Sequence, residues 1–143
     1  MTARACTLAD VKKLAALEEE CFSAPWTEGL LSGTLARADF CGFLIEEKGE
    51  VAGYICGGSL FEDAEIARVA VAEKFRRKGL GGKLLETFEN EAKARGAKRI
   101  FLEVRVSNRP AIGLYTARGF ESFHVRKKYY ADGEDAVEMK KQL

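Results

Sequence analysis

Apolar and polar positions change their period along the chain, and the first stretch predicts two helices. Over residues 8–22 the apolar side chains recur every three or four positions: Val11, Leu14, Ala15, Leu17 and Cys21. This is the spacing of one helix face, so we expect a helix there. Thr7 precedes it and forms a capping box with Asp10. After a break at Pro25, Thr27 can cap a second, shorter helix.

Strand-like segments fill the middle and the end of the chain. They are residues 2–6, 40–46, 51–60, 65–72, 100–106, 120–126 and 136–140. The turn signal Lys48-Gly49-Glu50 joins the second and third segments, and we expect residues 40–72 to form an antiparallel meander. Over residues 100–106, alternation places Glu103 on the face opposite Leu102.

Two more helices complete the predicted architecture. One carries an apolar stripe from Leu80 and stops at Gly96, and a last helix capped by Asn108 ends at Gly119. The resulting order is strand, two helices, three strands, helix, strand, helix, two strands. This order predicts a mixed α/β fold, with a twisted, mostly antiparallel sheet of about seven strands and helices on both faces. We expect a single domain over residues 1–143.

Composition and charge narrow the class of protein. Hydrophobic residues make up 47% and charged residues 31%, with a formal net charge of +1. A charge this close to zero argues against a general attraction to nucleic acid or to a membrane. Residues 1–17 lack an uninterrupted apolar core, and the longest weakly polar run, residues 51–61, is too short to span a bilayer. We expect a cytoplasmic monomer or weak dimer.

The cysteines give no sign of a metal site or a nucleophile. Cys6, Cys21, Cys41 and Cys56 include no CxxC pair, and His124 is the only histidine. Structural zinc sites use short-spaced ligand pairs, so we expect no metal and four reduced, mostly buried thiols. No cysteine lies near His124 in the sequence, so no Cys–His pair is indicated.

A basic, glycine-rich turn carries the first indication of chemistry. It is Arg76-Arg77-Lys78-Gly79-Leu80-Gly81-Gly82, between a predicted strand and a predicted helix. The first backbone N–H groups of a helix lack partners within the helix and carry partial positive charge. Glycines let a phosphate approach the backbone, so the turn can hold a pyrophosphate.

The common glycine motifs do not match this turn. A P-loop needs glycine where Arg77 stands and Ser or Thr where Leu84 stands, and a dinucleotide fingerprint needs glycine at Leu84. We also expect no simple parallel βαβ unit after the preceding strand. The alternative is a turn that is basic and glycine-rich without binding a ligand.

The turn resembles the acetyl-CoA signature of the GNAT N-acetyltransferases, through Arg76-x-x-Gly79-x-Gly81 preceded by Val69-Ala70-Val71. The resemblance implies the GNAT fold and acetyl-CoA as cosubstrate. It implies that the backbone of Val69, Ala70 and Val71 contacts the pantetheine arm. It also implies a pyrophosphate site made by Arg76, Arg77, Lys78, Gly79, Leu80, Gly81 and Gly82.

Further blocks resemble the RimI-like branch of that family, which acetylates an N-terminal alanine of a small-subunit ribosomal protein. They are Pro25-Trp26-Thr27-Glu28, Leu102-Glu103-Val104-Arg105, Ser107-Asn108, Ala111-Ile112, Leu114-Tyr115, Gly119-Phe120, Tyr129-Tyr130 and Gly133-Glu134-Asp135-Ala136. The resemblance implies a protein N-terminus as partner, Glu103 as base, Tyr115 as acid and Asn108 as a cofactor contact. It implies that Trp26, Tyr129 and Tyr130 form walls of the acceptor groove.

The sequence departs from that branch at three positions. Arg76 stands where Gln is usual, Arg68 where Asn is usual, and Ala131 where Pro is usual. Arg68 precedes the cofactor strand, close to the expected acceptor, so it is a candidate substrate-binding residue and bears on substrate identity.

The chemistry favours an α-amine as acceptor. An α-amine has an ordinary pKa of about 7.7–8.0 and lysine about 10.4, so far more α-amines are neutral near pH 7. Nothing in the sequence indicates a general base strong enough to deprotonate a lysine side chain. Glu103 can act as base directly or through water, or it is a solvent-facing carboxylate paired with Arg105, or an anchor for the acceptor's ammonium. Tyr115 is the acid or an aromatic core residue.

Simpler roles stay open for the other candidates. Asn108 can cap its helix without touching a cofactor, and Trp26 and the tyrosine pair can be ordinary packing residues. Two other functions fit the same turn: acetylation of a small amine or amino acid, and non-catalytic acyl-CoA binding. The short basic runs at residues 76–78 and 127–128 are typical of solvated surface, so we expect no nucleic-acid partner.

Overall fold

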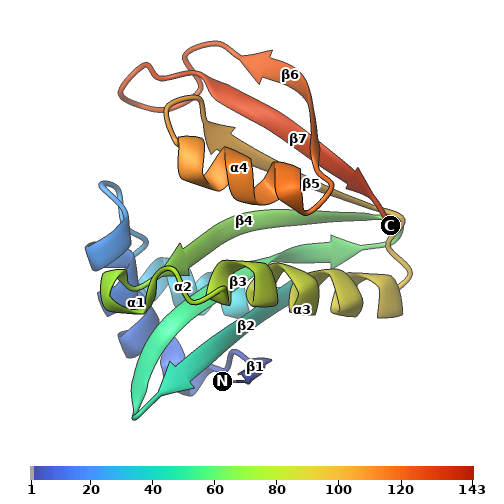
Figure 1. Cartoon of the computed structure of the whole chain (residues 1–143). Coiled ribbons are helices and arrows are strands. Elements are labelled where there is room, and N and C mark those ends of the chain that lie inside the picture. Colours follow the sequence, from blue (N-terminus) through green and yellow to red (C-terminus); the bar gives the residue numbers. More distant parts are fainter. Residues whose placement is uncertain (1) are drawn as a thin grey trace.

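The computed structural model describes residues 2–143, so only Met1 lies outside it, and contains a seven-stranded sheet with helices packed on it (Figure 1). The strand order is β1-β2-β3-β4-β5-β7-β6. The β4–β5 pair is parallel and the other neighbouring pairs are antiparallel. The predicted mixed, mostly antiparallel sheet is confirmed.

The elements lie close to their predicted positions. The strands are β1 Ala3–Ala5, β2 Phe40–Glu47, β3 Glu50–Leu60, β4 Asp63–Val71, β5 Arg99–Arg105, β6 Glu121–Arg126 and β7 Ala136–Gln142. The helices are α1 Val11–Cys21, α2 Glu28–Leu35, α3 Leu80–Ala94 and α4 Arg109–Ala117, with 3₁₀ turns at Leu8–Asp10 and Glu73–Phe75. The first predicted helix therefore begins with a 3₁₀ turn. There the Asp10 carboxylate accepts from the Thr7 N–H at 2.7 Å.

Helices cover both faces of the sheet, as predicted. The α3 side of the core contains Ile45, Ile55, Ile66, Leu84, Phe88, Ile100 and Tyr115. The α1 and α2 side contains Val11, Leu14, Leu17, Leu31, Leu44 and Tyr54. Helix α4 packs with α3, because its partly buried Leu114 joins the first of these two clusters.

The prediction that no parallel βαβ unit follows the glycine-rich turn is wrong. β4 and β5 pair in parallel from Asp63↔Arg99 to Ile66↔Leu102, and α3 is the crossover between them (Figure 1). Antiparallel neighbours can be joined by a tight hairpin, whereas parallel neighbours need a long connection, usually helical. The helix after the glycine-rich turn provides that connection.

A β-bulge interrupts β4 just before residues 69–71, the segment that the family resemblance assigns to the cofactor. In the β3–β4 ladder Cys56 pairs with Arg68 and Gly57 pairs with Ile66, so Ala67 is the extra residue. Such a bulge changes the alternation of side chains beyond it. Without it, Ile66 and Arg68 would share a face.

The bulge decides where the following side chains point. Ile66 before it and Val69 after it both face the α3 side of the core. Arg68 lies between them and instead reaches Glu18 of α1. The extra residue Ala67 thus directs Arg68 toward α1 and keeps Val69 in contact with the α3 side of the core.

We expect Gly57→Val to lower the free energy of unfolding by about 2 kcal/mol or more. A Cβ at Gly57 would lie 1.8 Å from the Glu65 carbonyl oxygen, which is backbone and cannot move aside easily. Urea denaturation measures the change. Gly33→Ala in α2 is the control, because its Cβ meets nothing within 4 Å, and it should be neutral or stabilising by up to about 1 kcal/mol. Equal stability of the two variants would contradict this explanation of the bulge.

Candidate active site

β4 and β5 are paired only near their starts and then diverge (Figure 1). The divergence opens a cleft of about 510 Å³. Its lining includes the predicted site residues Trp26, Arg68, Val69, Glu103, Asn108, Tyr115, Tyr129 and Tyr130. Residues far apart in the sequence therefore meet in one cleft.

The strand expected to receive the pantetheine arm borders this cleft. Val69, Ala70 and Val71 pair with β3 on one side. On the other side no strand is paired with them, because the pairing of β4 with β5 ends at Ile66. Backbone groups on that edge have no strand partner. The Val71 carbonyl oxygen accepts from Arg76 instead, and the other groups need a partner when they are covered. A bound amide-containing ligand can provide it.

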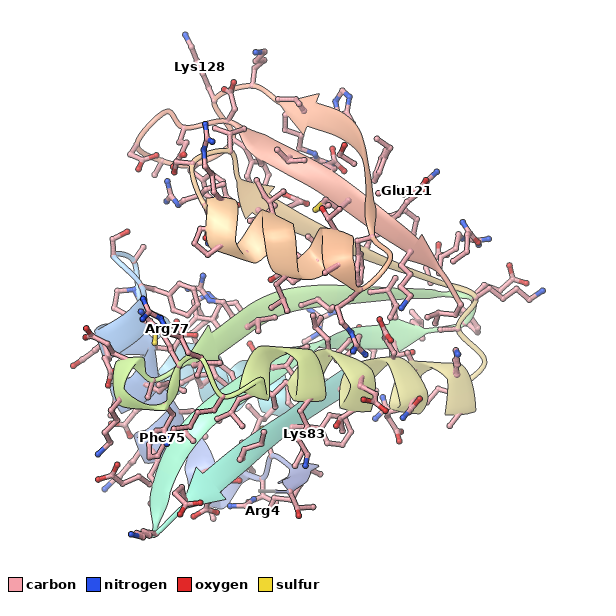
Figure 2. The ribbon with its side chains drawn as sticks, viewed as in Figure 1. Arg4, Phe75, Arg77, Lys83, Glu121 and Lys128 are labelled. Carbon is pink, nitrogen blue, oxygen red and sulfur yellow. The ribbon has the colours of Figure 1, made fainter. Side chains whose placement is uncertain are left out.

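The glycine-rich turn leads directly into α3. Gly79 is the N-cap residue and has a φ of +76°, in the left-handed region that favours glycine. Arg77 also has a positive φ, of +65°, and Figure 2 shows it on the loop ahead of the helix. Arg77 and Lys78 are exposed, so their charges add to the partial positive charge of the helix start.

Arg76 is bound to its own strand. Its Nε donates to the carbonyl oxygen of Val71 at 2.9 Å, and its Nη2 lies 3.9 Å from the Cys21 sulfur. The guanidinium therefore holds the turn against the end of β4. This fixes the position of the α3 N-terminus relative to the cofactor strand.

The glycines of the turn have different surroundings. A Cβ at Gly81 would lie 3.0 Å from Cδ2 of Leu114, so this glycine allows close packing of α3 on α4. At Gly79 and Gly82 a Cβ would meet nothing within 4 Å. The open surface that a phosphate can approach therefore lies over Gly79 and Gly82, a distinction that the sequence does not reveal.

A second hollow, of about 530 Å³, continues from the turn along α3. It is lined by Gly79, Gly82, Lys83, Glu86, Thr87, Asn90 and Arg118. Sequence reasoning missed both of its cations. Lys83 had a visible signal, because it stands in the first turn of the helix after the glycines (Figure 2). Arg118 joins the hollow only through the packing of α4 on α3.

Glu103 faces the cleft from β5 and forms no ion pair with residues 2–143. The suggested pairing with Arg105 is wrong, since Nη1 of Arg105 lies 2.8 Å from Asp132 and 2.9 Å from Glu134. Oε2 of Glu103 is buried without a hydrogen-bond partner. The neighbouring Glu103 carboxylate is the main cause that raises the pKa of Tyr129.

Tyr115 is a core residue that also reaches the cleft. It is 8% exposed, and its ring packs edge-on against Phe120 with centroids 5.8 Å apart. Burial raises the pKa of Tyr115 to about 12, so the hydroxyl remains protonated throughout the physiological range. The two roles considered from the sequence are therefore compatible.

Asn108 and the tyrosine pair close the cleft from the β5 and β7 side. Oδ1 of Asn108 accepts from the Ala111 N–H at 3.2 Å, which confirms the predicted cap of α4. Tyr129 and Tyr130 form an edge-to-face pair with centroids 5.1 Å apart. The Arg105 guanidinium lies 4.0 Å from the Tyr130 ring centroid, which fixes this ring against β5.

Arg68 is bound by a buried carboxylate. Glu18 is 0% exposed and lies 3.1 Å from Nη2 of Arg68. The same carboxylate accepts from the Trp26 N–H at 2.8 Å and from the Tyr54 hydroxyl. Arg68 also donates to the Ala24 carbonyl oxygen at 3.0 Å. Three buried or half-buried donors thus share one carboxylate.

The same arginine stacks on the α1–α2 loop. Its guanidinium carbon lies 4.1 Å from the Phe22 ring centroid and 4.6 Å from that of Trp26. Arg68 therefore fastens this loop, one wall of the cleft, to β4. Sequence reasoning missed Glu18, because it stands among three consecutive glutamates and resembles an exposed helix face.

Two further properties concern the part of the chain from residue 2 onward. It contains no helix that is both long and apolar enough to cross a membrane. It also contains no group of three or more His, Cys, Asp or Glu side chains suited to a metal ion. All four cysteines are free; Cys41 and Cys56 are buried, and burial raises the pKa of Cys56 to about 12.

The sequence matches the acetyltransferase (GNAT) family over residues 11–120. The chain belongs to this family. Acetyl-CoA is the acyl donor of GNAT acetyltransferases, and the open, cationic start of α3 suits its diphosphate. This acetyltransferase therefore has the predicted cosubstrate.

Its relatives include enzymes named as N-acetyltransferases of a ribosomal-protein alanine and as N-alpha-acetyltransferases. The [ribosomal protein bS18]-alanine N-acetyltransferase of Escherichia coli (strain K12) is 32% identical over 126 residues, covering 86% of this chain and 84% of the relative. An N-alpha-acetyltransferase of Sulfurisphaera tokodaii is 40% identical over 110 residues, covering 68% of this chain and 66% of the relative.

This chain is also similar to a solved structure over nearly its whole length. The crystal structure of the ribosomal-protein-S18-alanine N-acetyltransferase from Escherichia coli has a TM-score of 0.91 at 30% identity, covering 99% of this chain and 92% of that chain. The predicted resemblance to the RimI-like branch is confirmed.

We expect Glu18→Ala to lower the free energy of unfolding by about 3 kcal/mol or more, because it leaves the Tyr54 hydroxyl, the Trp26 N–H and Arg68 without their carboxylate. Urea denaturation checks the loss. Glu19→Ala, one residue along and exposed, should change stability by less than about 0.5 kcal/mol. If both variants lost the same amount, Glu18 would not be stabilising the loop.

Proposed function

We propose that this acetyltransferase transfers acetyl from acetyl-CoA to the α-amine of a protein N-terminus, with the N-terminal alanine of a small-subunit ribosomal protein as acceptor. The observation that carries the proposal is the meeting of Glu103 and Tyr115 in one cleft beside the unpaired edge of β4. One supplies an unpaired carboxylate oxygen and the other a protonated hydroxyl.

The chain holds its cosubstrate with backbone groups and cations. The first backbone amides of α3 bind the diphosphate, because Gly79 and Gly82 leave them accessible to a ligand. Arg77 and Lys78 add positive charge. The edge of Val69 to Val71 binds the pantetheine amides. Asn108, at the start of α4, contacts the same arm from across the cleft.

Transfer proceeds by direct attack of the amine on the thioester. The amine nitrogen forms a bond to the carbonyl carbon while the carbon–sulfur bond breaks. Glu103 accepts the proton that the amine loses, directly or through water. Tyr115 donates to the departing thiolate, and its pKa of about 12 keeps that proton in place until then. No covalent enzyme intermediate is needed.

Two arguments support an N-terminal acceptor. The α-amine is partly neutral near pH 7, so a single carboxylate suffices as base, whereas lysine would need a stronger one. The names of the Escherichia coli and Sulfurisphaera tokodaii relatives describe acetylation of a ribosomal-protein alanine and of α-amines. We place the reaction in the cytoplasm, where ribosomal proteins are made.

A peptide beginning with Ala should be acetylated at its α-amine and not at an internal lysine. Mass spectrometry with fragmentation, after incubation with acetyl-CoA, locates the acetyl group. The matched control is the same peptide with its α-amine already blocked, which should remain unmodified. Labelling of lysine alone, or of a small amine such as spermidine in preference to every peptide, would refute the proposed acceptor.

Glu103→Gln and Tyr115→Phe should each lower kcat by about 10²- to 10⁴-fold while the fold is retained. In the wild type, kcat/KM should rise with pH as the α-amine loses its proton near pH 8. It should stay level to about pH 10, because Tyr115 titrates only near 12. Circular dichroism controls for folding. Full activity of both variants would remove these residues from the mechanism.

A further inference from the structure

The acceptor side of the cleft carries a second carboxylate that the proposed reaction does not use. Glu65 of β4 and Glu103 of β5 both line the cleft. The β4–β5 register pairs Glu65 with Phe101, two residues before Glu103. Both carboxylates therefore lie on the face of the sheet opposite the buried Ile66 and Leu102.

The arginines around these two carboxylates are already paired with other acids. Arg68 pairs with Glu18, Arg105 with Asp132 and Glu134, Arg126 with Glu138, and Arg37 with Asp39, at N–O distances of 2.7 to 3.1 Å. Glu65, like Glu103, forms no ion pair within residues 2–143. Partial burial is the main cause that raises the pKa of Glu65, and the nearby Glu103 carboxylate adds to it.

A reacting α-amine cannot balance both charges. It must be neutral to attack, and its proton passes to Glu103. Glu65 is exposed beside that carboxylate, so it can take a second positive group of the acceptor. An extended peptide advances only about 3.3 Å per residue, so the side chain after the acetylated residue lies within reach of this part of the cleft.

We propose that Glu65 selects acceptors in which the residue after the acetylated one is Lys or Arg. This inference rests on the proposed function and names the class of N-terminus that the cleft accepts. Its physical basis is charge complementarity, since an unpaired carboxylate at the rim of a cleft attracts a cation and repels an anion. Its effect lies in acceptor binding and not in the chemical step.

The test uses three peptides that begin Ala-Lys, Ala-Ala and Ala-Glu and are otherwise identical. For the wild type, kcat/KM should be about three- to fivefold higher for Ala-Lys than for Ala-Ala, mainly through KM. High salt should reduce the ratio. Glu65→Gln should bring it close to one, and Glu65→Lys should shift the preference to Ala-Glu. Glu121→Gln is the control, because Glu121 is exposed at the start of β6 and outside the cleft lining (Figure 2).

The outcomes separate this inference from the proposed function. Calorimetry of the same peptides with the coenzyme A complex gives a binding readout that does not depend on activity. Acetylation of all three peptides without a charge preference, or with one that Glu65→Gln leaves unchanged, overturns the inference alone. A Glu65-dependent binding preference without acetylation of any peptide supports the charge selection and overturns the proposed function alone. Absence of both peptide binding and acetylation overturns both.

Discussion

The short parallel pairing of β4 and β5, followed by their divergence, is the constraint on which the site depends. The strands share only the register from Asp63↔Arg99 to Ile66↔Leu102. If the ladder continued, β5 would occupy the edge of Val69 to Val71, and no backbone groups would remain for a pantetheine chain. The bulge at Ala67 lies at the point where pairing stops, where a bulge increases strand twist and redirects side chains.

Positive and negative charges nearly cancel over the whole chain, but they are separated in space around the site. The formal net charge is only +1. Cations gather at the start of α3, while the β4 and β5 walls present unpaired carboxylates, because the arginines among them are each bound to another acid. The charge that suits an anionic cosubstrate therefore lies at the start of α3, beside the second hollow, and the charge that suits a cationic acceptor lies in the cleft between β4 and β5. Composition averages over the chain and conceals this separation.

Local patterns predicted the elements well, because their causes are local. The capping positions Thr27 and Asn108 are occupied as expected, with side chains accepting from Leu30 and Ala111 N–H groups. The period of the apolar residues placed the seven strands and the two-sided helix packing. Motif resemblance named several residues that line the cleft, among them Trp26, Glu103 and Tyr115, but not Glu65.

Features that depend on distant partners escaped sequence reasoning. The parallel β4–β5 pair, the bulge opposite Gly57 and the hollow beside Arg118 each need residues far apart in the chain. Arg68 departs visibly from the pattern of its family branch, but its partner Glu18 lies 50 positions earlier, within a run of three glutamates. Neither the period nor the spacing of the apolar residues predicts which of three successive glutamate side chains is buried.

The Glu18–Arg68 pair has a consequence for how new specificities can arise in this scaffold. The loop from Phe22 to Trp26 forms one wall of the cleft and is fastened to the interior through that pair. Redesign of this wall by single substitutions would pass through intermediates with an uncompensated interior charge and low stability. Tyr129 on the opposite wall is 46% exposed, so directed evolution toward other acceptors has more freedom if it begins there.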